Sequence, residues 1–246
     1  MKYATKKIVR DYTATVTIAV ALAILIRTYV VEAYRIPNHS MKPVLLAGDT
    51  IFVSKWSQTV NKNILPRRGD ILVFTSSVGS SSDGKGNGNG PDYIRRVVGL
   101  PGDTLALKGG HLFLNGAPLL ITDKHTAQSP CFRERFAQIS EELEYQICLE
   151  GSVFPDFGPE KVTKDFVFVM EDSRTVTQQN TVDLQQGTSK RKGWGLIPLS
   201  SIKGKAFWIW LSIQESNEEK NKELDKSSGK FNWLPRFRWE RMFRRI

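Results

Sequence analysis

The most informative stretch of the chain is Ile36-Pro-Asn-His-Ser-Met-Lys-Pro-Val-Leu45, which is followed by Gly48-Asp49 and by Ile51-Phe-Val-Ser-Lys55. Its last part belongs to a strand predicted over residues 50–56, because β-branched and aromatic residues fit the pleated surface of a sheet. Ser40 therefore lies on a segment that leads directly into a strand.

Downstream of this stretch the sequence continues as strands. They are predicted at residues 70–75, 93–98, 103–107, 165–170 and 206–211. Residues 111–119 are predicted to form a β-hairpin, because Asn115-Gly116 supplies the positive φ angles of a tight two-residue turn. No long amphipathic helix interrupts the strand pattern, so the predicted fold class is mostly β, with an antiparallel β-sheet.

Upstream of the same stretch lies an apolar run. Residues 14–26 are uncharged and mostly apolar, and after Arg27 the apolar character resumes through Val31. A basic N-terminus precedes the run, which predicts a single transmembrane helix over residues 13–31, with residues 1–12 in the cytoplasm and the main domain on the exported side. The alternative is a cleaved secretory signal that ends at Val31-Glu32-Ala33.

Composition and charge narrow the classes of partner. The chain has 246 residues and a net charge of +10, which favours an anionic partner. Much of this charge lies in residues 2–10 and 236–245, at the two ends, so we expect contact with membrane lipid and not with nucleic acid. No cofactor or metal is expected, because the only cysteines, Cys131 and Cys148, lack metal-ligand spacing. They form either a disulfide or two buried free thiols.

The rest of the chain divides into a domain and a tail. Residues 32–214 are expected to form the β domain, with a flexible Gly/Ser-rich insert at 76–91. Residues 215–246 form a charged linker and a basic amphipathic tail. In the tail, an apolar set would fall on one face of a helix: Trp239, Met242, Phe243 and Ile246. Such a tail would lie in a membrane interface, pack on the domain or fray.

The segment around Ser40 resembles the nucleophile segment of the type I signal peptidase (leader peptidase) family. That family has a Ser-Met pair, a Pro two residues after the Met, and a Gly-Asp before a strand; these are Ser40, Met41, Pro43, Gly48 and Asp49 here. Further blocks match in the same order: residues 68–74, 93–103, 168–174, 194–198 and 202–206. The resemblance implies a membrane-bound serine endopeptidase, which removes signal peptides from exported preproteins. The membrane would be a bacterial-type plasma membrane or an internal one such as the thylakoid.

The resemblance also implies roles for individual residues. Ser40 would be the nucleophile, and Asn38 would donate to the oxyanion together with the backbone N–H of Ser40. The implied substrate-binding residues are Ile36, Pro37, Met41, Tyr93 and Ile94, and the implied supporting residues are Asp172 and Arg174.

One position departs from the family pattern. The family's general base is a lysine, and Arg95 stands in its place. A guanidinium has no acceptor and is effectively never deprotonated in a protein, so Arg95 cannot take the proton of Ser40. The family's Gly-Asp-Asn-Arg is replaced by Glu171-Asp-Ser-Arg174, and the Ser that would hold the lysine is not identifiable in residues 175–183.

No other residue replaces that lysine convincingly. His39 adjoins Ser40, but consecutive residues in an extended segment point to opposite sides. The remaining candidates are expected to be solvated: Lys42, Lys55, His111 and His125. Two hypotheses follow. The chain is an active signal peptidase with an unidentified base, or it is a catalytically impaired or inactive paralogue that binds signal or extended peptides as a membrane-anchored regulatory or binding module.

Overall fold

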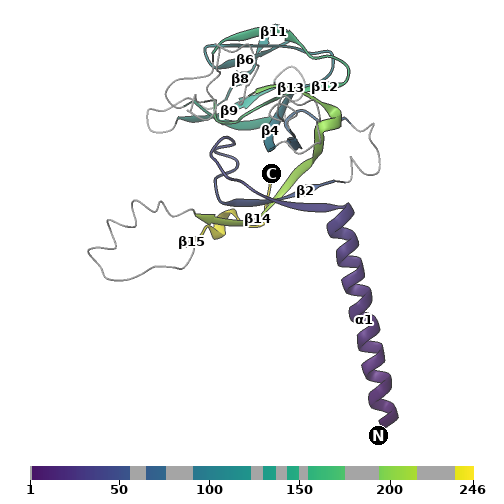
Figure 1. Ribbon diagram of the computed structural model, residues 1–246. Coiled ribbons are helices and arrows are strands. Elements are labelled where there is room, and N and C mark those ends of the chain that lie inside the picture. The colour runs from purple at the N-terminus through teal and green to yellow at the C-terminus, as the bar shows by residue number, and fades with distance from the viewer. Residues whose placement is uncertain are drawn as a thin grey trace, which may run out of the picture.

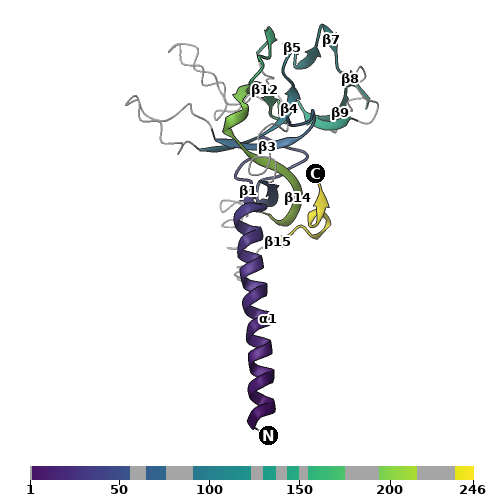
Figure 2. The ribbon, with the colours of Figure 1, turned by 90° about the vertical axis from the view of Figure 1, so that its right-hand side faces the viewer.

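The computed structural model describes residues 2–55, 65–75, 91–122, 130–136, 143–149, 155–174, 194–214 and 236–246. Within these ranges the protein consists of one long N-terminal helix that projects from a β domain (Figures 1 and 2). The insert expected at 76–91 lies outside the described residues except for residue 91, and the linker expected after residue 214 lies outside them up to residue 235.

Helix α1 spans Lys2–Tyr29 and is followed, after one residue, by strand β1 (Val31–Arg35). Its part from Tyr12 to Tyr29 has a mean hydropathy of 1.5 and is not buried by the domain. It is long and apolar enough to cross a membrane. A signal sequence near an N-terminus has the same length and apolar composition. The helix ends before the predicted end of the span at residue 31, because Val31 pairs with Ser54 of strand β2 (Asp49–Ser54).

In the described part of the chain the main sheet contains nine strands, which pair antiparallel. Its central path runs β1-β2-β14-β3-β4-β12-β13. The members not yet given are β3 (Ile71–Thr75), β4 (Asp92–Gly99), β12 (Phe166–Met170), β13 (Trp194–Pro198) and β14 (Ile202–Gln214), with the 3-10 helix η1 (Leu199–Ser201) between the last two. The prediction of a mostly β, antiparallel fold is confirmed.

Two smaller sheets complete the domain. One has the order β11-β5-β6-β7, from β5 (Thr104–Lys108), β6 (His111–Leu114), β7 (Ala117–Pro118) and β11 (Phe157–Lys161). Asn115 and Gly116 join β6 to β7 with φ angles of 51° and 85°, so the predicted hairpin turn is confirmed. The other has the order β10-β9-β8, from β8 (Leu120–Ile121), β9 (Cys131–Arg135) and β10 (Glu144–Cys148). Cys131 and Cys148 pair across it and form a disulfide, so the structure shows the first of the two alternatives for these cysteines.

One cluster of the hydrophobic core lies directly behind the Ser40 segment. It joins the side chains of Ile36, Met41 and Leu45 to those of Ile51 on β2 and Ile94 on β4, all of them buried. Full burial of such a side chain contributes about 1.5–3 kcal/mol relative to exposure. The segment that carries Ser40 is therefore held by core packing.

The C-terminal tail is not the α-helix that the sequence predicted. It consists of β15 (Arg236–Phe237), the 3-10 helix η2 (Trp239–Arg241) and β16 (Arg244–Arg245). Both short strands pair with β14, at residues 208–209 and 213–214, whereas β3 pairs with β14 only at residues 202–205. In Figure 2 the yellow tail lies beside β14. The helix prediction was wrong because the edge of β14 beyond β3 offers backbone hydrogen bonds, which outweigh an isolated 3.6-residue periodicity.

Candidate active site

Ser40 lies on a loop between β1 and β2 whose two ends are tied together. The N–H of Ile36 donates to the carbonyl of Asp49 at 2.7 Å, and the N–H of Gly48 donates to the carbonyl of Ile36 at 2.9 Å. Gly48 has a φ of +86°, and a Cβ there would lie 1.9 Å from the carbonyl oxygen of Ile213, so the position requires glycine. The loop is therefore closed at its base.

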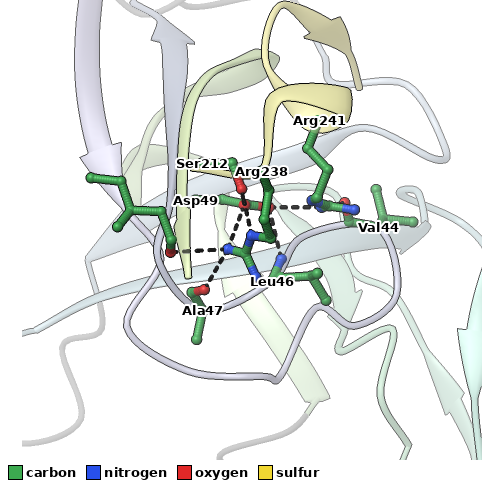
Figure 3. A network of polar contacts seen from close by, with 8 residues as sticks. Val44, Leu46, Ala47, Asp49, Ser212, Arg238 and Arg241 are labelled. Atoms are coloured by element: carbon green, nitrogen blue, oxygen red, sulfur yellow. Dashed lines mark hydrogen bonds and ion pairs between the residues drawn. The ribbon is translucent and has the colours of Figure 1, made fainter. Parts of the chain in front are cut away.

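A buried carboxylate, Asp49, joins the end of this loop to the C-terminal tail (Figure 3). Its Oδ1 accepts hydrogen bonds from Ser212 Oγ at 2.6 Å and from Arg238 Nη2 at 3.1 Å. Its Oδ2 accepts hydrogen bonds from Arg241 Nη2 at 2.7 Å and from the N–H of Leu46 at 2.9 Å. The two guanidinium groups balance a negative charge that would be costly to bury alone.

The same two arginines also bind the backbone of the loop. Arg238 Nη2 donates to the carbonyl of Ala47 at 2.8 Å, and Arg241 Nη2 donates to the carbonyl of Val44 at 2.8 Å (Figure 3). The sequence left membrane contact and packing on the domain open for the tail, and it did not predict that these arginines bind the loop. The available signal was the alternation of arginine and aromatic residues in 236–245.

Contacts from two other segments and from its own loop fix Ser40 itself. Its carbonyl accepts the N–H of Ser173 at 3.0 Å. Its N–H donates to Oδ1 of Asn38 at 3.2 Å, and its hydroxyl oxygen accepts a long hydrogen bond from Arg95 Nη1 at 3.4 Å. The structure thus brings together the three residues for which the sequence predicted catalytic positions.

Arg95 approaches Ser40 as a proton donor. It is buried on β4, and its Nη2 forms an ion pair with Oε1 of Glu171 at 2.5 Å. Its Nη1 also donates to the carbonyl of Ile94 at 2.7 Å. Burial lowers the pKa of the Arg95 guanidinium, and the charge of Glu171 opposes that shift. Because a guanidinium keeps its proton in a protein, the hydroxyl of Ser40 meets a donor where a general base would have to accept.

The predicted oxyanion donors are bonded to each other. Because Oδ1 of Asn38 accepts the N–H of Ser40, that N–H already has a partner in this conformation. Pro37, a predicted substrate contact, precedes Asn38 and is exposed. The oxyanion role of Asn38 stays a prediction.

The other predicted substrate-binding residues fall into two groups. Ile36 and Met41 are buried in the core, and the N–H and the carbonyl of Ile36 are both bonded within the loop. Tyr93 and Ile94 lie on β4, which pairs with β12 only at residues 96–99. Of the strands that the structure describes, none pairs with the first part of β4 on that side. The first part of β4 therefore runs beside Ser40 without a strand partner on that side among the described strands.

Asp172 and Arg174 anchor the segment that follows β12. Asp172 is buried and accepts two hydrogen bonds from Arg96, Nε to Oδ1 at 2.7 Å and Nη2 to Oδ2 at 2.6 Å. Arg174 is buried too and forms an ion pair with Glu134, which also accepts the hydroxyl hydrogen of Tyr145 at 2.7 Å. Buried pairs with several hydrogen bonds hold their geometry tightly. They fix both ends of the segment that contacts Ser40.

Sequence reasoning missed three charged partners in and around the site. Glu171 had a usable signal, because it replaces a glycine of the resembled block. Arg96 had one as well, since it is adjacent to Arg95 in the same block. Glu134 had none, because the sequence did not predict a strand at β9.

The alternative bases are placed as follows. His39 and His111 are exposed, Lys42 is half-buried, and Lys55 forms an ion pair with Glu32 at 2.9 Å. His125 lies outside the described residues. Within the part of the chain that the structure describes, no group of three or more His, Cys, Asp or Glu residues could hold a metal ion.

Known proteins with similar sequences point to one family. The family described as "Signal peptidase, peptidase S26" matches residues 9–211. Signal peptidase I P of Bacillus subtilis subsp. natto is 31% identical over 219 residues, which cover 87% of this chain and 95% of that protein. Signal peptidase I of Leptolyngbya laminosa is 34% identical over 199 residues, which cover 79% of this chain and 77% of that protein. A crystal structure of a signal peptidase I from Enterococcus faecalis aligns with 58% of this chain and 97% of its own at 21% identity, with a TM-score of 0.29. The sequence matches cover most of the chain, which therefore belongs to the type I signal peptidase family.

Proposed function

We propose that this chain binds the signal-peptide region of exported preproteins and does not hydrolyse it by the family's serine–lysine route. The observation that carries the proposal is the contact of Arg95 with Ser40. The guanidinium donates to the hydroxyl oxygen at 3.4 Å and is paired with Glu171. The loss of a general base typically costs about 10²–10⁴-fold in rate, and the loss of one member of a coupled catalytic unit can cost about 10⁶-fold.

The open edge of β4 supports the binding part of the proposal. An extended peptide can add to an exposed strand edge through main-chain hydrogen bonds, while pockets beside the edge select its side chains. Tyr93 and Ile94 lie on this edge, and Ser40 lies beside it through its contact with Arg95. This mode of binding requires no general base.

An active serine endopeptidase is the second candidate. Ser40 and Met41 are both present, and relatives named signal peptidase I align with most of the chain. A cation beside the hydroxyl would also favour the serine alkoxide. This candidate requires a base that takes the proton of Ser40 in place of Arg95.

Membrane attachment is part of the proposal. We assign α1 as a retained span with its N-terminus in the cytoplasm and the β domain on the exported side. Pairing of β1 with β2 over its whole length supports retention, because a cut after Ala33 would divide a paired strand. The tail supports contact with lipid, because Trp239 and Phe243 are 71% and 65% exposed and lie among exposed arginines.

The test uses the full-length protein in detergent. A signal-bearing preprotein is incubated with wild type, with Ser40→Ala and with Ser201→Ala, a matched control on η1. Binding is followed by fluorescence anisotropy and cleavage by electrophoresis. We expect all three proteins to bind and none to cleave. Cleavage by wild type and Ser201→Ala that Ser40→Ala abolishes would overturn the proposal and establish the second candidate.

A further inference from the structure

We infer that Glu171 is a positioning residue that holds a positive charge at position 95 beside Ser40, an effect called the lock below. Arg95 and Glu171 would then replace the family's lysine and glycine as one unit. The inference deepens the proposed function and rests on it. It assigns the lack of hydrolysis at Ser40 to these two residues together.

The geometry of the pair carries the first step. Arg95 Nη2 and Glu171 Oε1 are 2.5 Å apart, and the two side chains are 6% and 4% exposed. Either charge alone would be costly at this depth, because a buried ion without a partner is strongly destabilising. Together they are close to neutral, so each charge lowers the cost of burying the other.

The surroundings of Glu171 carry the second step. The residue before it, Met170, pairs with Trp194 in the sheet. The next residue, Asp172, is held by two hydrogen bonds from Arg96, and Ser173 donates its N–H to Ser40. With the backbone fixed on both sides, the carboxylate of Glu171 is held against position 95.

The third step concerns the base that the family uses. A buried lysine serves as a base when loss of water lowers its pKa towards the neutral amine, and a carboxylate within about 4–6 Å opposes that shift by favouring the ammonium. At position 95 a lysine would face Glu171 and remain an ammonium. Arg95→Lys alone therefore leaves a protonated side chain beside Ser40. Removing the charge of Glu171 as well favours the neutral amine that can act as a base.

The test compares Arg95→Lys, Arg95→Lys/Glu171→Gln and Arg95→Lys/Glu144→Gln. Glutamine keeps the size of residue 171 and removes its charge, and Glu144 is an exposed carboxylate on β10 that serves as the control. Modification of the lysine at position 95 by an amine-reactive reagent is followed across pH by mass spectrometry, together with preprotein cleavage. We expect the titration midpoint of this lysine to fall by about 1–3 pH units in the Glu171 double variant only. The fraction of neutral amine at neutral pH then rises by about tenfold per unit.

The outcomes separate this inference from the proposed function. Equal midpoints in the three variants would overturn the lock, and so would full cleavage activity in Arg95→Lys alone. Serine-dependent cleavage by the wild type would overturn the proposed function, while the midpoints would still decide whether Glu171 holds the charge at position 95.

A second measurement covers the case in which the lysine variants fail to fold. Thermal unfolding is compared for Arg95→Met, Glu171→Gln and Arg95→Met/Glu171→Gln. The lock predicts a higher melting midpoint for the double variant than for either single variant, because only the single variants bury one charge of the pair after its opposite charge has been removed. A double variant that loses the sum of the two single losses would overturn it.

Discussion

Asp49→Asn should lower the free energy of unfolding by about 3 kcal/mol. Removing one partner of a buried ion pair costs about 3–5 kcal/mol, because the other charge is left buried without compensation. The lower end applies here, since the side chains of Arg238 and Arg241 keep 18% and 12% exposure. Both arginines also keep their hydrogen bonds to backbone carbonyls of the loop.

The assay is thermal unfolding of the full-length protein in detergent, followed by far-UV circular dichroism. For a domain of about 150–250 residues, each kcal/mol shifts the melting midpoint by about 2–4 °C, so a fall of about 6–12 °C is expected. The matched control is Asp92→Asn. Asp92 is exposed and pairs with Lys203 at 2.7 Å, and such a pair contributes at most about 1 kcal/mol.

Two results would refute this reasoning. The first is an Asp49→Asn protein that melts no earlier than Asp92→Asn, which would show that the tail does not stabilise the fold through this carboxylate. The second concerns Arg241→Met, which should cost less in the Asp49→Asn background than in wild type. Equal costs would mean that the contact between Arg241 and Asp49 contributes nothing.

Two further predictions concern the disulfide and β1. Loss of the bond between Cys131 and Cys148, which are separated by 17 positions, should cost about 3 kcal/mol, measured by urea unfolding of Cys131→Ser/Cys148→Ser against wild type; equal midpoints would contradict it. Glu32→Gln should cost less than about 1 kcal/mol at neutral pH. Burial opposes the charge of Glu32, but hydrogen bonds from Lys55 and Tyr34 and the charge of Lys55 outweigh it, so the pKa of Glu32 is lowered. A lowered folded-state pKa stabilises the fold above the ordinary value, and this stabilisation is lost as the pH falls through the folded value. The difference in melting midpoint between wild type and Glu32→Gln should therefore close in acid, and a difference that persists there would count against it.

Strands could be predicted where local signals agree. Strand β2 alternates buried and half-buried residues, with Ile51 and Val53 in the core, and its sequence is rich in β-branched residues. The turn at Asn115-Gly116 was predictable because its residue types tolerate positive φ. Strand β9 was not, because its sequence Cys-Phe-Arg-Glu-Arg carries little apolar alternation. Its conformation depends on its partner β10 and on a buried ion pair.

The site was predictable in part. The resemblance located Ser40 and Arg95, and the structure confirms that they are neighbours. The ion pair of Arg95 with Glu171 was not predicted, because it joins residues far apart in sequence and forms only when β4 and β12 lie side by side. The tail was misjudged for the same reason. Helical periodicity is a local signal, whereas the carboxylate of Asp49 that binds the tail belongs to β2.

The join between α1 and β1 has a mechanical consequence. A single residue, Val30, connects them, and its carbonyl accepts the N–H of Lys55 at 2.9 Å. So short a connection couples the orientation of α1 to that of β1, which pairs with β2 at the base of the Ser40 loop. With α1 held in a bilayer, this short connection would limit the distance between Ser40 and the lipid surface. A flexible insertion after Tyr29 would remove that limit on the distance.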